Sequence, residues 1–295
     1  MKSAVQTQPR AATAASDLAE LVKARLSLLA VATAMAGFAL GVRETWGWLL
    51  LSATLAGTAL SAAGAAALNQ WWEQEHDALM KRTRQRPLPA GRMASSDALL
   101  AGLALSLAGV ACLALFANTL SAGLAAATIV FYILVYTPLK RVTTLNTIIG
   151  AVPGALPPLI GWTAARGSID AEGLTLFAIL FLWQMPHFLA IAWLYRADYA
   201  QAGFKMLSEG DESGALTGRQ AVVYSLALLV VSLLPSVFFG YSALYFYGAL
   251  GLGVGFTALA GKFAVSGGSV PAARALFLGS IAYLPLLLGL MVLAR

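Results

Sequence analysis

Polar side chains at helical spacing follow a long apolar run in the first third of the chain. Asn69, Glu73 and Asp77 are spaced at i, i+4 and i+8, so on a helix they fan over about 80° and share one stripe. His76 falls within the same stripe. Carboxylate and amide oxygens are hard ligands that suit Mg²⁺ held together with a substrate phosphate. The segment therefore indicates a metal-and-phosphate site where a helix leaves an apolar environment.

Cations that could neutralise a phosphate ester lie in three segments. Arg82 and Arg86 follow the acidic stripe directly, and Lys140 and Arg141 end a Tyr-Thr-Pro-Leu-Lys-Arg segment. Lys205 stands further along, in a second polar stretch. Lys and Arg both bind phosphate oxygens, Arg through a bidentate fork. These five side chains are the candidates for diphosphate binding.

A third acidic residue, Asp198, follows another apolar run that contains a Trp-Gln-Met-Pro-His-Phe segment. If one helix carries both, His187 and Asp198 differ by about 20° in azimuth and lie about 16 Å apart along its axis. Gln184 lies close to that face. Polar groups at membrane depth are costly and usually face a cavity. A face running from a metal at the surface to polar groups inside the membrane is therefore predicted.

The elements that must position these residues are apolar. The 295-residue chain is 59% hydrophobic and 11% charged, with a mean hydropathy of +0.77, whereas soluble domains are about 25% charged. Successive runs of about 20 apolar residues predict an all-α polytopic membrane protein, and the short alternating segments of a β-barrel are absent from the sequence. The predicted spans are residues 24–42, 48–70, 97–117, 120–137, 145–165, 173–195, 220–239, 243–262 and 274–294.

The remaining segments complete the expected organisation. Residues 1–20 are expected to be a disordered tail, and residues 21–295 to form one transmembrane domain with a central cavity. Its two long loops, residues 71–96 and 196–219, hold most of the candidate site residues.

The distribution of cations predicts the orientation. With the N-terminus in the cytoplasm, sixteen of the 19 Lys and Arg residues fall on the cytoplasmic side, and only Arg43, Arg166 and Arg295 lie opposite. This agrees with the excess of Lys and Arg in cytoplasmic loops of membrane proteins. Both long loops then face the cytoplasm, and the cavity is expected to open there.

The motifs resemble those of the UbiA superfamily of intramembrane prenyltransferases. That family usually carries Asn-Asp-x-x-Asp-x-x-x-Asp followed by Arg-Thr-x-x-Arg-Pro, and a second Asp-x-x-x-Asp motif across the cavity. Here the first motif has Glu73 at its middle acidic position and is followed by Arg82-Thr83-x-x-Arg86-Pro87. The second keeps Asp198 but has Ala202 four residues later.

Those departures match one branch of the family, the protoheme IX farnesyltransferases or heme O synthases. That branch is characterised by Asn-x-x-x-Glu-x-x-x-Asp, Tyr-Thr-Pro-x-Lys-Arg, a Gly-Ala-rich segment ending in Pro-Pro-x-x-Gly-Trp, and Trp-Gln-x-Pro-His-Phe. The chain has each of them, the last three at residues 136–141, 150–162 and 183–188, with Pro153 as one departure. The resemblance covers roughly residues 20–295.

The resemblance implies farnesyl transfer from farnesyl diphosphate to a vinyl group of heme b with addition of water, giving heme O. It implies Mg²⁺ at Glu73, Asp77 and Asp198, with Asn69 beside it, and diphosphate at the five cations named above. His76, Gln184 and His187 are the residues expected to face heme. The expected setting is the bacterial inner membrane, with lipid around the protein, heme A synthase as a partner and no nucleic acid.

Two alternatives remain open. One is a prenyltransferase of the same superfamily that acts on an aromatic quinone precursor, which would share the metal site. Ala202 and the Trp183–Phe188 segment favour heme as acceptor. The other is a transporter, which would be expected to bind its substrate near the bilayer midplane on broken helices. The acidic residues instead lie at helix ends on one side.

Overall fold

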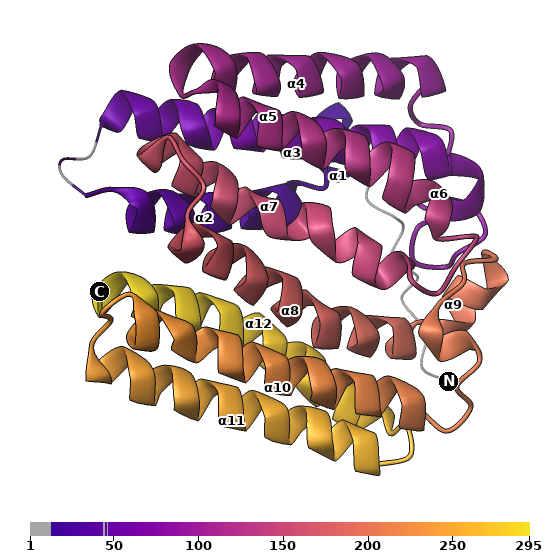
Figure 1. Cartoon of the computed structure of the whole chain (residues 1–295). Helices are drawn as coiled ribbons and strands as arrows, with labels where there is room; N and C mark the ends of the chain where they lie inside the picture. The colour runs from indigo at the N-terminus through magenta and orange to yellow at the C-terminus, as the bar shows by residue number, and fades with distance from the viewer. Residues whose placement is uncertain (1–12, 44, 46) are drawn as a thin grey trace, which may run out of the picture.

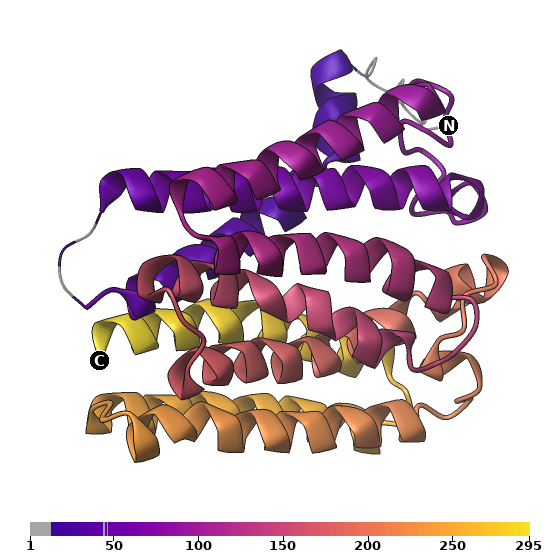
Figure 2. The same ribbon diagram turned by 45° about the horizontal axis from the view of Figure 1, so that its top comes forward.

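A computed structural model describes residues 13–43, 45 and 47–295, and the described residues form a bundle of long helices lying side by side (Figures 1 and 2). The expected tail over residues 1–12 lies outside the described residues. The elements are α1 (Ala14–Leu21), α2 (Ala24–Gly41), α3 (Trp48–Asp77), α4 (Ser95–Phe116), α5 (Thr119–Val130), the π-helical η1 (Phe131–Tyr136), α6 (Thr137–Leu139), α7 (Asn146–Arg166), α8 (Ala171–Leu194), α9 (Arg196–Gln201), the 3₁₀ turn η2 (Leu207–Glu209), α10 (Ala215–Phe238), α11 (Ala243–Val265) and α12 (Val270–Leu293).

Nine segments of the described residues are long and apolar enough to cross a membrane, and they coincide with the nine predicted spans. They are α2, α3, α4, the continuous α5–η1–α6 segment, α7, α8, α10, α11 and α12. The prediction of an all-α polytopic protein is confirmed over the part of the chain that the structure describes. Loop residues 78–94 and α9 lie at one end of the bundle, opposite the C-terminus (Figure 1).

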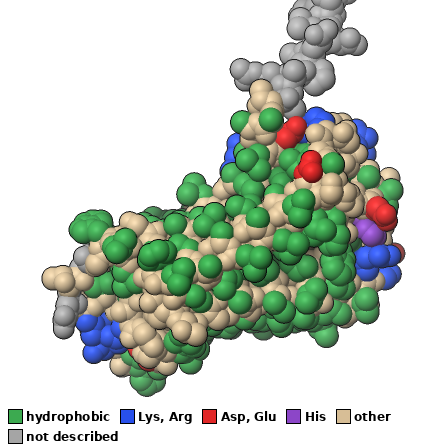
Figure 3. Space-filling model, turned by 90° about the horizontal axis from the view of Figure 1, so that it is seen from above, with side chains coloured by type: hydrophobic (Ala, Val, Ile, Leu, Met, Phe, Trp, Pro, Cys, Tyr) green, Lys and Arg blue, Asp and Glu red, His purple; other side chains and the backbone are tan. Residues whose placement is uncertain are grey.

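The membrane-spanning helices differ in how much of their surface is buried, and this difference shows where the core lies. In the most apolar 18-residue stretch of α7, 67% of the residues are buried, compared with 22% in the corresponding stretch of α4. The largest apolar core is packed between α7, α8, α10, α11 and α12 and includes Trp162, Trp183 and Tyr245. Large apolar side chains such as Leu107 and Leu115 are exposed on the outer helices, and charged side chains gather at the two ends of an apolar flank (Figure 3). This is the surface that a surrounding bilayer requires.

Close helix contact depends on small residues at the centre of the bundle. A Cβ atom on Gly37 of α2 would lie 1.9 Å from the carbonyl oxygen of Pro158 in α7, and a Cβ on Gly161 would lie 1.8 Å from that of Ala34. Only glycine allows the two backbones to approach this far. The contact fixes α2 against α7, which has three internal prolines yet remains one continuous helix.

The structure differs from the expectations at three junctions. Residues 14–20, expected in the disordered tail, belong to helix α1, whose N-cap Thr13 and Ser16 form a reciprocal capping box. Residues 71–77, expected at the start of a loop, extend α3 to Asp77. The expected loop 196–219 contains α9, η2 and the start of α10. Short polar helices of this kind lack the apolar periodicity by which spans are recognised.

Candidate active site

The predicted stripe lies on one helix and is buried. Asn69, Glu73 and Asp77 occupy the last three turns of α3, with exposed fractions of 0%, 6% and 1%. Asn69 connects several elements, because its amide nitrogen donates to a Glu73 oxygen at 2.9 Å and to the Thr137 hydroxyl at 3.1 Å. Burial of three polar side chains requires that each be hydrogen-bonded or paired.

Glu73 is paired with Lys140, which follows α6. The Lys140 ammonium donates to both carboxylate oxygens, at 2.8 and 2.9 Å. Burial would lower the pKa of Lys140, but the Glu73 carboxylate outweighs this effect and raises it above its usual value. The ammonium also lies 4.7 Å from the centre of the Tyr136 ring. Lys140 therefore stays protonated and holds the site's central carboxylate.

Asp77 is paired with a second cation. The Arg86 guanidinium donates to it at 2.6 Å, and the Thr83 hydroxyl donates to the Asp77 carbonyl oxygen at 2.8 Å. These contacts fold residues 78–86 back over the end of α3. Arg82, in the same loop, donates to the Tyr199 hydroxyl at 3.2 Å and lies over the Tyr195 ring. The Arg-Thr-x-x-Arg segment thereby positions two guanidinium groups at the mouth of the site.

A π-helical turn brings the opposite wall into place. The six residues of η1 interrupt the α-helical ladder, and the Thr137 hydroxyl donates to the Tyr132 carbonyl oxygen at 2.8 Å. Such a turn changes the direction in which the following side chains point. As a result Tyr136 and Lys140 face the α3 stripe.

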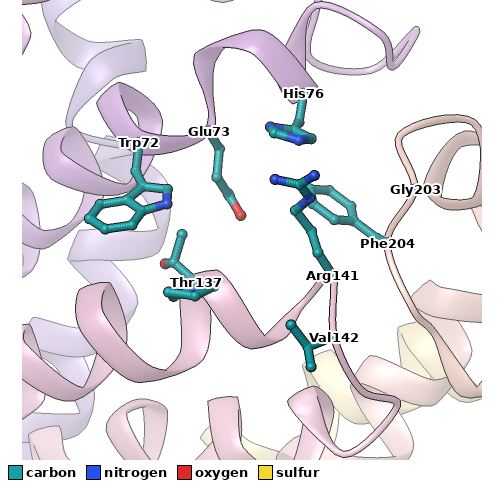
Figure 4. A pocket seen from close by; sticks show the side chains of 9 residues that line it. Trp72, Glu73, His76, Thr137, Arg141, Val142, Gly203 and Phe204 are labelled. Carbon is teal, nitrogen blue, oxygen red and sulfur yellow. The ribbon is translucent and has the colours of Figure 1, made fainter.

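Two adjoining cavities share Glu73. The smaller, of about 140 Å³, is polar and is lined by Asn69, Glu73, Asp77 and four cationic side chains: Lys23, Arg82, Arg86 and Lys140. The larger, of about 460 Å³, is mainly apolar. Its lining includes Trp72, His76, Thr137, Arg141 and Phe204, and Glu73 points into it from α3 (Figure 4).

Lys23 is a site residue that was not among the sequence-based candidates. Its ammonium donates to the Asn69 side-chain oxygen at 2.6 Å. Burial, together with the Arg86 and Lys140 cations, lowers the pKa of Lys23 from 10.5 to about 7. Lys23 is also the sole described non-glycine residue with a positive φ, at 46°. Its side chain reaches the site because the chain turns sharply between α1 and α2, which a lysine before an apolar run does not reveal.

Of the other predicted site residues, His76 and Arg141 line the larger cavity, whereas Lys205 lines neither cavity. His76 stacks on Phe204 at 6.0 Å in the larger cavity, together with Arg141. The Lys205 side chain is half-exposed and pairs with Glu209 at 3.9 Å, and it lines neither cavity. Its backbone nitrogen instead donates to the Lys140 carbonyl oxygen at 2.7 Å.

Asp198 does not continue the α8 helix. The helix ends at Leu194, Tyr195 adopts φ −114° and ψ 22°, and Asp198 lies on the separate α9. The expected alignment of Asp198 with His187 along one straight helix is therefore absent. Asp198 is partly exposed and lines neither described cavity.

Ala202, at the position where a second acidic residue is usual, is 4% exposed. It packs with Met80, Ala192 and Phe204 in an apolar cluster beside the polar cavity.

Gln184 and His187 lie deeper, on α8. Gln184 is buried and donates to the carbonyl oxygens of Ala151 and Leu180. His187 is partly exposed, and its Nδ1 lies 2.7 Å from the Ser280 hydroxyl of α12.

The donor set fits Mg²⁺ in part. Two carboxylates and one amide oxygen face a single small cavity, which is hard-ligand chemistry. No cluster of three His, Cys, Asp or Glu side chains suited to a metal occurs among the described residues. Both carboxylates are bonded to cations, so a metal would displace Lys140 or Arg86 from them. Those cations would then be available to phosphate oxygens.

Comparison with known proteins identifies the family. The UbiA prenyltransferase family pattern matches residues 30–288. The chain belongs to the UbiA prenyltransferase family. It is 45% identical over 288 residues to a protoheme IX farnesyltransferase of Solibacter usitatus, covering 95% of this chain and 98% of that protein. A protein of the same name from Opitutus terrae is 44% identical, covering 99% and 98%.

Solved structures share this fold. A digeranylgeranylglyceryl phosphate synthase superposes with a TM-score of 0.79 at 15% identity, covering 95% of this chain and 98% of that one. A UbiA homologue from Archaeoglobus fulgidus bound to DMAPP and Mg²⁺ superposes with a TM-score of 0.67 at 14% identity, covering 94% and 99%. The arrangement of helices is therefore shared although little of the sequence is.

Proposed function

We propose that the protein transfers the farnesyl group of farnesyl diphosphate to a vinyl group of heme b, with addition of water, and so forms heme O. The observation that carries the proposal is the polar cavity, where four cations and two carboxylates meet at the end of a membrane-spanning helix. The excess of cations suits a diphosphate, and the apolar cavity beside it suits a prenyl chain. Relatives that carry the name protoheme IX farnesyltransferase support heme as the acceptor.

The cations stabilise the leaving group. As the allylic C–O bond breaks, negative charge builds up on the diphosphate, and preorganised charges in a site shielded from water stabilise that change. Arg82, Arg86, Lys140 and Lys23 are already positioned around one cavity. Arg141 and Lys205, also predicted to bind diphosphate, would need to swing inward to reach it.

Mg²⁺ is the proposed metal, with Glu73, Asp77 and Asp198 as its ligands and Asn69 beside them. Bound there, it would neutralise diphosphate charge. The Archaeoglobus fulgidus homologue, which binds DMAPP and Mg²⁺, supports this choice.

The acceptor, heme b, forms the new carbon–carbon bond. The vinyl carbon of heme b attacks farnesyl C1 as diphosphate departs, water captures the resulting cation on the porphyrin side, and one proton is released. His76, Gln184 and His187 are the residues proposed to face heme. Apolar walls such as those formed by Trp72 and Phe204 exclude water from farnesyl C1 until the carbon–carbon bond has formed.

The proposed setting is the bacterial inner membrane, with the cation-rich end and both cavities on the cytoplasmic side. At that end Lys and Arg outnumber Asp and Glu, in agreement with the cytoplasmic bias of basic residues. The product would pass to heme A synthase, the partner that the resemblance implies.

Mass spectrometry of extracted hemes tests the reaction. Membranes containing the protein are incubated with heme b, farnesyl diphosphate and Mg²⁺. A new heme heavier by one farnesyl and one hydroxyl group, absent after chelation of Mg²⁺, is expected. Unmodified heme from folded protein would contradict the proposal, and a prenylated aromatic acceptor would identify the quinone-precursor reaction instead.

A further inference from the structure

His187 is held by a chain of hydrogen bonds that determines which ring nitrogen carries the proton. The Ser280 hydroxyl donates to the Phe277 carbonyl oxygen at 2.5 Å. A hydroxyl has one hydrogen, so Ser280 can only accept at its contact with His187 Nδ1. Nδ1 is therefore protonated, and in the neutral imidazole Nε2 carries a free lone pair.

The ring is fixed in orientation as well as in protonation. Trp183 stacks on His187 with ring centres 5.1 Å apart, and Phe277 packs at the same distance from another side. Trp183 also donates from Nε1 to the Ser280 carbonyl oxygen at 2.8 Å, which ties α8 to α12 at this level. Ser280 is fully buried. His187 itself is partly exposed, and no hydrogen bond to Nε2 occurs among the described residues.

This is the arrangement that metal-bound histidines have. Such a histidine almost always donates its other ring N–H to an oxygen, which fixes the tautomer and raises the basicity of the coordinating nitrogen. A neutral imidazole surrounded by aromatic rings is also a ligand suited to the iron of a planar porphyrin.

The place of His187 on α8 shows how its ring lies relative to the polar cavity proposed to bind diphosphate. His187, Ile191 and Tyr195 are spaced at i, i+4 and i+8, so His187 lies about 12 Å deeper than Tyr195 on nearly the same stripe. The Tyr195 ring is covered by Arg82, which lines the polar cavity. An iron bound at Nε2 would therefore lie within the membrane, on the stripe that leads to the leaving group.

We infer that His187 Nε2 is an axial ligand to the iron of the porphyrin substrate and that Ser280 is the positioning residue that keeps Nε2 unprotonated. The inference rests on the proposed function for the choice of an iron porphyrin. It assigns one defined atom to acceptor binding, whereas His76, the other histidine of the chain, lies in the larger cavity.

Heme titration of the purified full chain, without prenyl diphosphate, tests this. Absorption and electron paramagnetic resonance spectra of wild type with ferric heme are expected to show nitrogen ligation. His187→Ala and the less disruptive His187→Gln should lose that signature, and added imidazole should restore it in His187→Ala. Lys81→Met, which replaces an exposed cation that lines neither described cavity, is the control and should keep it. Thermal unfolding confirms that each variant is folded.

Ser280 gives a second readout. Ser280→Ala is expected to weaken heme affinity by about 10- to 100-fold, as for other partners of metal-bound histidines. Ser280→Thr retains the hydroxyl and should restore both the affinity and the ligand-field spectrum, which a role in packing alone would not predict.

An unchanged spectrum in both His187 variants, or a wild type that binds heme without nitrogen ligation, would overturn the inference. The proposed function is judged separately by the mass of the product. Wild type that forms the farnesylated heme while His187 variants keep the native spectrum would refute iron ligation alone. Wild type that neither binds heme nor forms product would refute both.

Discussion

Glu73 accepts hydrogen bonds from Lys140 and Asn69, and Asp77 accepts one from Arg86. While these bonds persist, neither cation can bind a phosphate oxygen with full strength. When diphosphate and metal bind, the carboxylates must therefore exchange their cation partners for the metal, and the cations must turn to the phosphate oxygens. The net charge of the site changes little in this exchange. Since an unpaired charge in a buried site is costly, the internal pairs keep the site stable before substrate arrives.

Lys140→Met is expected to lower kcat/KM for the prenyl diphosphate by about 10²-fold or more, because it removes a charge that stabilises the leaving group. It should also destabilise the fold by about 3–5 kcal/mol, since Glu73 is left buried and unpaired. Adding Glu73→Gln should recover much of the stability but not the activity. Lys81→Met, on an exposed cation outside both cavities, is the control. Equal loss in the control would contradict a specific role for Lys140.

Asp77→Ala and Asp198→Ala are both expected to reduce turnover by about 10²-fold or more, because each removes a proposed ligand of the metal. Their effects on stability should differ. Asp77 is buried and bonded to Arg86, so its loss leaves a cation without its partner. No hydrogen bond or ion pair of the Asp198 side chain occurs among the described residues, and its replacement should change stability by about 0.5 kcal/mol or less. Normal turnover of either folded variant would refute the metal assignment.

Lys23 predicts a dependence of stability on pH. Its pKa is lowered to about 7 in the folded protein from 10.5, so between these values the unfolded state binds more protons. Stability must then rise with pH across that window and be lower below about pH 7. The thermal midpoint of the ligand-free protein should increase by a few degrees from pH 7 to pH 10. Lys23→Met should remove this increase, and a variant with the wild-type slope would show that Lys23 titrates normally.

At the level of elements, the positions of residues on regular helices could be predicted from the sequence, and the positions of residues at breaks between helices could not. The stripe of Asn69, Glu73 and Asp77 was predictable because a regular α-helix fixes the azimuth of each residue, and α3 is one continuous α-helix to Asp77. The nine spans followed from apolar length alone. Asp198 could not be placed because the backbone leaves the helical conformation at Tyr195. Lys23 was missed because its approach depends on a left-handed backbone turn.

The α1 helix shows how a polar element can be necessary to the site. The Gln70 side chain donates to the carbonyl oxygens of Glu20 and Leu21, both at 2.7 Å, and Arg92 pairs with Asp17 at 2.9 Å. These bonds attach the end of α1 to α3 and to the loop before α4. They hold the backbone just before Lys23, so the position of the ammonium depends on contacts that no apolar pattern encodes.

The α2–α7 contact predicts a strong effect for a single methyl group. Gly37→Ala should destabilise the protein by about 1–3 kcal/mol, because the new Cβ would overlap the Pro158 carbonyl oxygen and force the helices apart. Gly251→Ala, also in a helix but with nothing within 4 Å of the new Cβ, should be neutral or stabilising by up to about 1 kcal/mol. Thermal unfolding in detergent compares them, and equal midpoints would show that the α2–α7 contact can relax.

For the molecule as a whole, the two ends differ in chemistry. The end that contains α9 and residues 78–94 carries both cavities and most of the cations. At the opposite end the charged side chains pair with each other or with the backbone: Arg295 donates to the Leu40 carbonyl oxygen and pairs with Glu172, which also accepts from Tyr241. We therefore expect a charged substrate head to enter from the cation-rich end, where both cavities lie, with an apolar tail among the helices.

This asymmetry makes the orientation in the membrane directly testable. Cys112 is the single cysteine, so Cys112→Ala gives a background free of thiols. In that background, Ser168→Cys reports on the end that contains Arg295 and Glu212→Cys on the cation-rich end, and both positions are exposed. A membrane-impermeant maleimide should label Ser168→Cys in intact cells and Glu212→Cys only after the membrane is opened. The reverse pattern would place the diphosphate cavity outside the cytoplasm, where it could not draw on a cytoplasmic supply of prenyl diphosphate.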